Sequence, residues 1–199
     1  MKFPQGTPDD LLALIRSYPL AWLTSHDAAG FAATPLPLIA ETDAEGRLTA
    51  LIGHCSRANP QVASLRANPL AMVQFIGPQA YVSPGIITRA GWAPTWNYAV
   101  ASFQVSVDFE AISTIEAVRR LTNLMEETQP APWAIEQAGE RLEPLIARVI
   151  GFRATILSGE ASFKMGQDED PVSYADILER HEDKVMVDWM RRLNPGREA

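Results

Sequence analysis

Residues 98–112 read YAVASFQVSVDFEAI, a stretch in which apolar and polar side chains alternate. Alternation with a period of two is typical of a β-strand that buries one face, so this stretch predicts a long strand. The chain also has 15 prolines and 12 glycines among 199 residues, and such frequent interruption favours short strands and turns over a helical bundle. We therefore expect a mainly β protein.

Five further stretches predict shorter strands on either side of this one. A turn at residues 26–30 joins the first two into a β-hairpin, and Pro35 and Pro37 place its second strand at an edge or a bulge, because proline donates no hydrogen bond to a sheet. The strands within residues 20–52 are expected to form a meander. The expected strands are residues 20–24, 31–39, 48–52 and 70–76, which ends before Gly77-Pro78, and a last strand within 145–157.

Helices are expected between and after the strands. Thr7-Pro8-Asp9-Asp10 has the features of a helix start, and Ser113-Thr114-Ile115-Glu116 is a capping box that opens a helix to about residue 128. Shorter helices are expected at residues 56–68 and 134–141, and an amphipathic helical segment at 173–193. We expect one domain over residues 1–199, with a C-terminal helical tail from about residue 170.

The charge balance bears on partners and location. The formal charge is −7, from 24 acidic and 17 basic residues, whereas direct DNA binding normally requires a basic surface. A single cysteine, Cys55, allows no intramolecular disulfide, and no apolar run approaches the roughly 20 residues of a membrane span. We expect a cytoplasmic protein without a signal peptide that binds neither a membrane nor, directly, nucleic acid.

Several standard catalytic and metal-binding signatures are missing from the sequence. It contains no Gly-x-Gly-x-x-Gly, no P-loop and no Gly-x-Ser-x-Gly. The three histidines are not spaced as a ligand pair, so no metal site is expected.

The first candidate site is the segment GHCSRANP, residues 53–60, which we expect to leave a strand, turn and open a helix. This arrangement brings a hydroxyl, a guanidinium and free backbone N–H groups together, which suits a terminal phosphate. An equally local interpretation makes Ser56 a helix N-cap and Arg57 a solvated residue of the first helical turn.

Two later segments are candidates for a planar ligand. In APTWNY, residues 93–98, aromatic rings alternate with polar side chains, which suits a planar ligand or a dimer interface, and equally a core anchor. In FKMGQD, residues 163–168, a cation and an amide follow the last strand; a surface loop is the alternative interpretation.

Four separated motifs follow one another in an order and spacing shared with a known family. They are Gly53-His54-x-x-Arg57-x-Asn59-Pro60; Gly77-Pro78-x-Ala80-Tyr81-Val82-Ser83-Pro84; Pro94-Thr95-Trp96-Asn97-Tyr98; and Gly151-Phe152 with Phe163-Lys164-Met165-x-Gln167. With these motifs, residues 1–167 resemble the PaiB-type FMN-binding negative transcriptional regulators.

The resemblance implies a six-stranded antiparallel split β-barrel of the FMN-binding type with peripheral helices. It further implies a homodimer that holds FMN in the groove between its subunits. By this resemblance His54, Ser56, Arg57 and Asn59 would lie at the FMN phosphate, and Thr95, Trp96, Asn97, Lys164 and Gln167 would lie near the flavin ring or the dimer seam.

The resemblance also implies a regulatory role, which the acidic charge would make indirect, through a partner or through redox sensing by the flavin. One alternative is an FMN-dependent oxidoreductase of the nicotinamide-linked flavin reductase type. Its catalytic residues are not assigned, and His54 and Tyr98 are the candidates for acid–base chemistry. Another alternative is a cofactor-free structural dimer, because Gly85-Ile86-Ile87 and Met165-Gly166-Gln167-Asp168-Glu169 depart from the family's usual residues.

Overall fold

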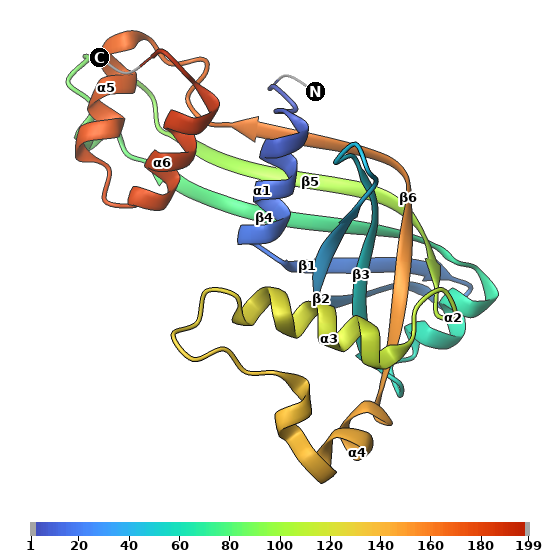
Figure 1. Ribbon diagram of the computed structural model, residues 1–199. Helices are drawn as coiled ribbons and strands as arrows, with labels where there is room; N and C mark the ends of the chain where they lie inside the picture. The colour runs from blue at the N-terminus through green and yellow to red at the C-terminus, as the bar shows by residue number, and fades with distance from the viewer. Residues whose placement is uncertain (1–2, 198–199) are drawn as a thin grey trace. The chain divides into compact units, whose positions relative to one another are not determined.

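Six β-strands form the framework of the protein in a computed structural model that describes residues 3–197 (Figure 1). They make a closed barrel in the order β1-β2-β3-β6-β5-β4, with antiparallel pairing of β1 with β2 and β4 and of β3 with β2 and β6. The predicted fold class is confirmed. The strands are β1 Leu20–Asp27, β2 Gly30–Thr42, β3 Leu48–Ser56, β4 Leu70–Val82, β5 Thr95–Asp108 and β6 Val149–Lys164.

Helices lie between the strands and after the last one. The α-helices are α1 Pro8–Ser17, α2 Gln61–Ala67, α3 Thr114–Glu126, α4 Leu142–Ile146, α5 Pro171–Arg180 and α6 Lys184–Leu193, and 3₁₀ turns span Pro84–Ile86 and Ile135–Arg141. Two predicted caps are confirmed: Thr7 Oγ1 accepts from the Asp10 N–H at 3.2 Å, and Ser113 Oγ accepts from the Glu116 N–H at 3.3 Å. The helical segment expected at residues 173–193 is two helices, and Asp183 caps the second by accepting from the Met186 N–H.

Most strands extend beyond their predicted ends, and β5 lies earlier in the chain than predicted. β4 continues through Gly77-Pro78, where the sequence predicts an end. β5 runs from Thr95 to Asp108 rather than over residues 98–112. β3 continues to Ser56 because β6 pairs with its last residues, His54 opposite Gly151 and Ser56 opposite Val149. Hydrogen bonds to a neighbouring strand thus extend a strand past the point where its own sequence predicts an end.

The prolines of β2 lie where the strand has only one neighbour. Residues 30–37 of β2 pair with β1, and residues 38–42 pair with β3. Pro35 and Pro37 belong to the first part, so the prediction of an edge is confirmed locally, although β2 as a whole pairs on both sides.

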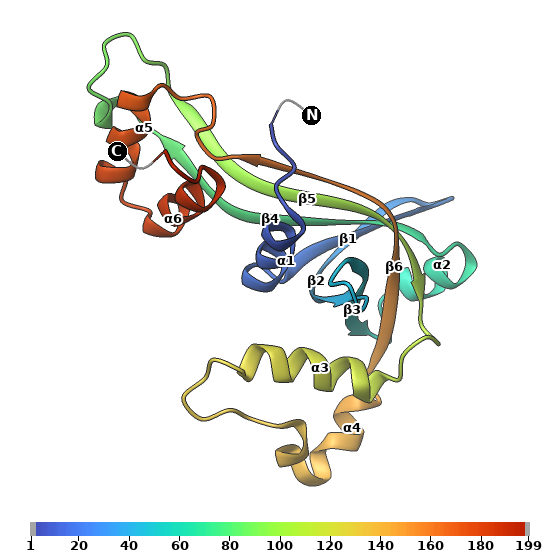
Figure 2. The ribbon, with the colours of Figure 1, turned by 45° about the horizontal axis from the view of Figure 1, so that its top comes forward.

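The chain divides into two compact units, which are described separately. The larger comprises residues 15–75 and 102–159, and its core includes Leu38, Leu51 and Phe152. In this unit a further apolar cluster lies beneath α3, and Figure 2 shows α3 with α4 and the chain that connects them. The cluster consists of Ile39, Ile52, Ala117 and Leu121.

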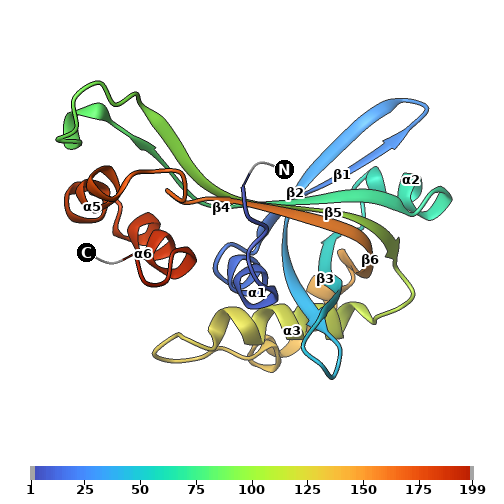
Figure 3. The ribbon, with the colours of Figure 1, turned by 90° about the horizontal axis from the view of Figure 1, so that it is seen from above.

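The smaller unit comprises residues 1–14, 76–101 and 160–199. Figure 3 shows α5 and α6 together in this unit. Phe163 of β6 stacks on Trp189 of α6, with ring centroids 6.2 Å apart, and Tyr174 and Ile177 of α5 are fully buried. Across the part of the chain that the structure describes, no helix is both long and apolar enough to cross a membrane.

Candidate functional site

Arg57 anchors the turn that follows β3 to the start of β6. Its Nε donates to the Ala147 carbonyl at 3.2 Å, and one Nη donates to the Val149 carbonyl at 2.8 Å. Its backbone N–H donates to the Arg148 carbonyl at 2.9 Å. The guanidinium is exposed and forms no ion pair with any carboxylate of residues 3–197, so its positive charge is available to a ligand.

The backbone of this turn does not offer the free N–H groups that the sequence predicts. Ala58 N–H donates to Ser56 Oγ at 3.3 Å, and Asn59 N–H donates to the Ser56 carbonyl at 3.0 Å. The alternative of Ser56 as the N-cap is also wrong, because Ser56 ends β3 and α2 begins at Gln61. A phosphate at this turn would therefore be bound by side chains, chiefly by the guanidinium of Arg57.

Asn59 and Gln61 hold the start of α2 against the β1–β2 hairpin. Asn59 Nδ2 donates to Thr34 Oγ1 at 2.9 Å, and Asn59 Oδ1 accepts from the Gln61 N–H at 2.9 Å. Gln61 is buried, and its role was not predicted because its partners lie about 30 residues earlier in the chain. Its Nε2 donates to the Leu23 carbonyl, to Ser25 Oγ and to the Ala32 carbonyl at 3.2, 2.9 and 3.1 Å.

His54 is a partly buried imidazole on β3. Burial lowers the pKa of its ring from the usual value, because it disfavours the charged form. Its Nδ1 is buried and has no hydrogen-bond partner among the described residues. On the neighbouring strand β6, Gly151 lies opposite His54. A side chain at position 151 would not fit, because its Cβ would lie 2.9 Å from the Ala117 Cβ of α3.

In the smaller unit, Thr95 and Lys164 are brought together, because Lys164 Nζ donates to Thr95 Oγ1. Trp96 is half exposed, and its Nε1 donates to Gln79 Oε1 at 2.7 Å. Its ring lies 5.9 Å from the ring of Tyr81, in a tilted arrangement. These residues form an exposed aromatic surface next to a lysine-bearing strand end.

The amides of Asn97 and Gln167 are turned to partners inside the smaller unit. Asn97 is fully buried, with Nδ2 at 3.8 and 3.5 Å from the sulfurs of Met186 and Met190, and its Oδ1 has no partner among the described residues. Gln167 Oε1 accepts from the Met165 N–H at 2.7 Å. The Asn97 amide is therefore closed off from solvent, whereas Gln167 is partly exposed.

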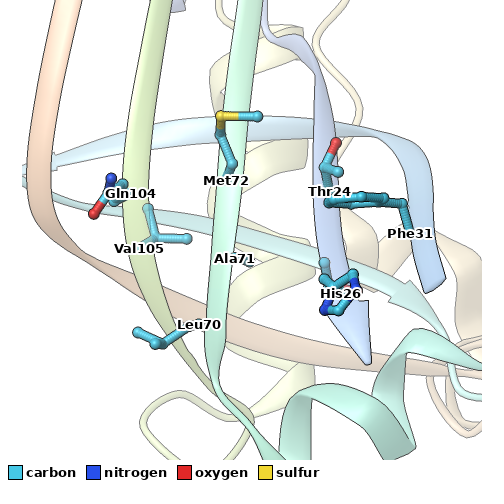
Figure 4. Close-up of a pocket in the computed structure, with 9 residues that line it drawn as sticks. Thr24, His26, Phe31, Leu70, Ala71, Met72, Gln104 and Val105 are labelled. Atoms are coloured by element: carbon cyan, nitrogen blue, oxygen red, sulfur yellow. The ribbon is translucent and has the colours of Figure 1, made fainter. Parts of the chain in front are cut away.

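A pocket of about 310 Å³ lies in the larger unit over β1, β2, β4 and β5. Figure 4 shows His26 and Phe31 on one side of it and Leu70, Met72 and Gln104 on the other. The rings of His26 and Phe31 are 4.7 Å apart, and Phe31 is 83% exposed. The lining carries no carboxylate, ammonium or guanidinium group; it consists of Thr24, Ser25, His26, Phe31, Leu70, Ala71, Met72, Gln104 and Val105.

No sequence motif indicates this pocket. In a strand with one buried face, the residues between the buried ones face outward. Apolar residues at such outward positions of β1 and β4, for example Trp22 and Met72, are the sequence feature that indicates an exposed apolar surface here. Thr24 of β1 lies directly opposite Met72 of β4, a pairing that depends on strand order and not on local sequence.

A closed, antiparallel six-stranded barrel with peripheral helices is the fold of split-barrel proteins, a class that includes flavin-binding members. The likeness to solved structures supports this fold. The chain superposes on an FAD- and heme-binding protein from Mycobacterium smegmatis with a TM-score of 0.59 at 17% identity, covering 90% of this chain and 80% of that one. It also superposes on a conserved hypothetical protein from Mycobacterium tuberculosis with a TM-score of 0.55 at 12% identity, covering 82% and 89%.

Residues 1–158 match the family described as "Putative FMN-binding domain", and the chain belongs to this family. It is 25% identical over 135 residues to the protease synthase and sporulation protein PAI 2 of Bacillus subtilis. That match covers 65% of this chain and 63% of the relative, so it spans less than two thirds of that protein. The predicted resemblance to PaiB-type proteins is confirmed, and FMN is the cofactor that the family membership supports.

The residues present fit a phosphorylated flavin. Most described arginines are matched with carboxylates, whereas Arg57 is not, and the Ser56 hydroxyl beside it accepts one hydrogen bond and retains its own proton for donation. A charged phosphate requires such donors, and an exposed aromatic ring such as that of Phe31 in the same unit is of the kind that suits a flavin ring.

Proposed function

We propose that this protein binds FMN as a homodimer and acts as a flavin redox sensor whose effect on transcription is indirect. The observation that carries the proposal is the unpaired guanidinium of Arg57, fixed by two backbone carbonyls at the end of β3. In this proposal His54, Ser56, Arg57 and Asn59 surround the phosphate. The residues proposed to lie near the flavin ring or the subunit seam are Thr95, Trp96, Asn97, Lys164 and Gln167. To contact the ring or the seam, the Asn97 amide would have to break its contacts with the sulfurs of Met186 and Met190.

The flavin supplies the redox chemistry when it is bound, and the chain's own residues bind and orient it. Arg57 supplies charge for the phosphate, and burial lowers the pKa of the neighbouring His54 ring and so disfavours a second charge there. Family membership supports FMN binding, and the regulatory part of the proposal rests on the resemblance of the sequence motifs to PaiB-type regulators.

Dimerisation is proposed through the uncharged outer face of the larger unit. Leu20, Trp22, Phe31, Leu70 and Met72 are exposed there, between 38% and 83% of each side chain. Two copies of a chain with a net charge of −7 repel each other, so a contact between them favours a neutral apolar face. A second copy is therefore the occupant that the charge of this protein suits best.

Analytical ultracentrifugation tests the dimer. Met72→Lys should shift the protein to a monomer, whereas Leu145→Lys, at a similarly exposed apolar residue of α4, should leave a dimer. A monomeric wild-type protein, or a dimeric Met72→Lys variant with unchanged dissociation constant, would contradict this part of the proposal.

The absorption spectrum and the thermal midpoint test FMN binding together. A ligand that binds only the folded state at 100 times its Kd stabilises it by about 2.7 kcal/mol, which corresponds to roughly 5–10 °C for a chain of this size. Purified protein that is colourless and gains no thermal stability from added FMN would leave the cofactor-free structural dimer as the better description.

A second candidate function is an FMN-dependent oxidoreductase, and a pocket lined without carboxylate, ammonium or guanidinium groups favours it. Thr24, His26 and Gln104 line this pocket, and their side chains make no hydrogen bond within the described residues, so they are available to a neutral planar substrate. Anaerobic addition of NADH or NADPH to the FMN-loaded protein distinguishes the functions. Bleaching of the flavin bands supports the enzyme, and an unchanged spectrum supports sensing.

The indirect action on transcription is tested with DNA alone. The chain has seven more acidic than basic residues, and most described arginines are already matched with carboxylates. A gel shift at physiological salt should therefore show no specific complex, and a tight complex with bare DNA would overturn the indirect mode.

A further inference from the structure

Two arginines without carboxylate partners lie next to each other at the end of the β3–β6 pair. Arg57 N–H donates to the Arg148 carbonyl at 2.9 Å, so the two backbones are in direct contact although the residues are about 90 positions apart. Neither side chain forms an ion pair with a carboxylate of the described chain. Four of the described arginines lack a carboxylate partner, and Arg57 and Arg148 are two of these four whose backbones are in direct contact.

Arg57 is held in one orientation by its contacts. The guanidinium donates through Nε to the Ala147 carbonyl and through one Nη to the Val149 carbonyl. A guanidinium has five N–H donors, so three remain for a ligand. The two carbonyls belong to the residues on either side of Arg148, and the same contacts therefore fix the backbone that carries the second cation.

Arg148 has no structural task that the described residues reveal. Its side chain is exposed and makes neither a hydrogen bond nor an ion pair among them. Two like charges at one strand end repel each other weakly in water, and an anion bound between them would remove that repulsion. Most other described arginines show the opposite pattern, such as Arg153 with Glu41 and Arg192 with Asp10.

We propose that Arg57 and Arg148 together bind a doubly charged phosphate monoester. The assignment rests on the proposed function, because it makes this ligand the terminal phosphate of FMN, and it adds a residue to the site that the sequence motifs do not include. A phosphate monoester carries between −1.5 and −2 charges at pH 7, which two guanidinium groups match and one does not. The site thereby selects FMN over riboflavin, which has no phosphate.

The test compares Arg148→Gln with Arg141→Gln. Arg141 is also exposed and without an ion pair among the described residues, but it lies in the preceding 3₁₀ turn. Fluorescence titration should show that Arg148→Gln weakens FMN about tenfold or more and leaves riboflavin unchanged. Arg141→Gln should change neither affinity. Because the Arg148 side chain has no partner to lose, the variant should fold like the wild type, as circular dichroism would verify.

Unchanged FMN affinity in Arg148→Gln, or an equal loss for FMN and riboflavin, would overturn the proposal while leaving FMN binding itself intact. Inorganic phosphate tests the pair independently of the flavin. At equal ionic strength, phosphate should raise the thermal midpoint of the apoprotein more than chloride does, and Arg148→Gln should abolish the difference. If the wild type binds no flavin, the proposed function fails, and the phosphate comparison still decides whether the arginine pair binds an anion.

Discussion

Gly151→Ala tests how closely α3 packs on β6 behind the candidate phosphate site. A Cβ on Gly151 would lie 2.9 Å from both the Ala117 Cβ and the Thr114 Cα. Carbon atoms in favourable contact are about 3.5–4.0 Å apart, so the first turn of α3 would have to move by roughly 0.6–1 Å. Neither atom can rotate away, because one is backbone and the other is the only side-chain carbon of an alanine.

The expected cost follows from two opposing effects. Overpacking of this kind destabilises by about 1–3 kcal/mol, while replacing glycine by alanine at a compatible backbone conformation stabilises by about 0.4–1 kcal/mol. Gly151 does not have a positive φ, so backbone strain adds nothing. The free energy of unfolding should fall by about 0.5–2 kcal/mol, and the hydrogen bond from the Gly151 N–H to Thr114 Oγ1 should weaken.

Urea denaturation followed by circular dichroism measures this change. Gly85→Ala is the matched control, because its φ is also not positive and its added Cβ would meet only Ser83 Oγ at 3.4 Å. Gly85→Ala should therefore be as stable as the wild type or slightly more stable, and Gly151→Val should lose more than Gly151→Ala. If the two alanine variants are equally stable, or if valine at position 151 costs no more than alanine, the packing argument is refuted.

Three further predictions concern the charged groups and the thiol. Arg57→Ala should weaken FMN by about 1.5–3 kcal/mol, the range for a hydrogen bond to a charged group, and unchanged affinity in a fluorescence titration would place the phosphate elsewhere. Burial raises the pKa of the Cys55 thiol to about 11, so a thiol reagent at pH 8 should react only after unfolding in urea; rapid reaction of the native protein would contradict this. The hydroxyl and the backbone N–H of Thr88 donate to the Asp176 carboxylate and lower its pKa in the folded protein. The stability that the ionised Asp176 contributes is therefore complete above the pKa of the unfolded state, about 4, and is lost as the pH falls through the lower pKa of the folded state. Amide protection of residues 83–94 should therefore fall on acidification below about pH 4 and already be low at pH 7 in Asp176→Ala, and equal protection in the variant would count against this role.

Local signals predicted those parts of the fold that local contacts stabilise. The caps at Thr7 and Ser113 were predictable because an N-cap bonds a backbone group two or three residues away. The hairpin of β1 and β2 was predictable for the same reason, since its partners are adjacent in the chain. The last residues of β3 were assigned to a turn, because the strand that pairs with them is about 95 residues later.

In the candidate site too, only the features that depend on neighbouring residues were predictable from the sequence. The sequence identified Arg57 as a candidate anion-binding residue from its neighbours Ser56 and Asn59. It did not reveal that Arg57 binds the carbonyls of residues 147 and 149, that Arg148 lies beside it, or that the Asn97 amide is buried against two methionine sulfurs. Each of these contacts joins residues about 90 positions apart, and no local pattern encodes such a pairing.

The sequence by itself determined the alternation that makes residues 98–112 a strand, the family membership that its motifs indicate, and an acidic charge that weighs against direct DNA binding. The tertiary structure alone decided which side chains are free to meet a ligand. Backbone N–H groups that the turn seemed to leave open are bonded within it, while the charge of Arg57 remains unmatched and acquires Arg148 as a neighbour. The physical reason is that propensity and periodicity act over a few residues, whereas hydrogen-bond satisfaction and charge pairing depend on strands brought together by the closed barrel.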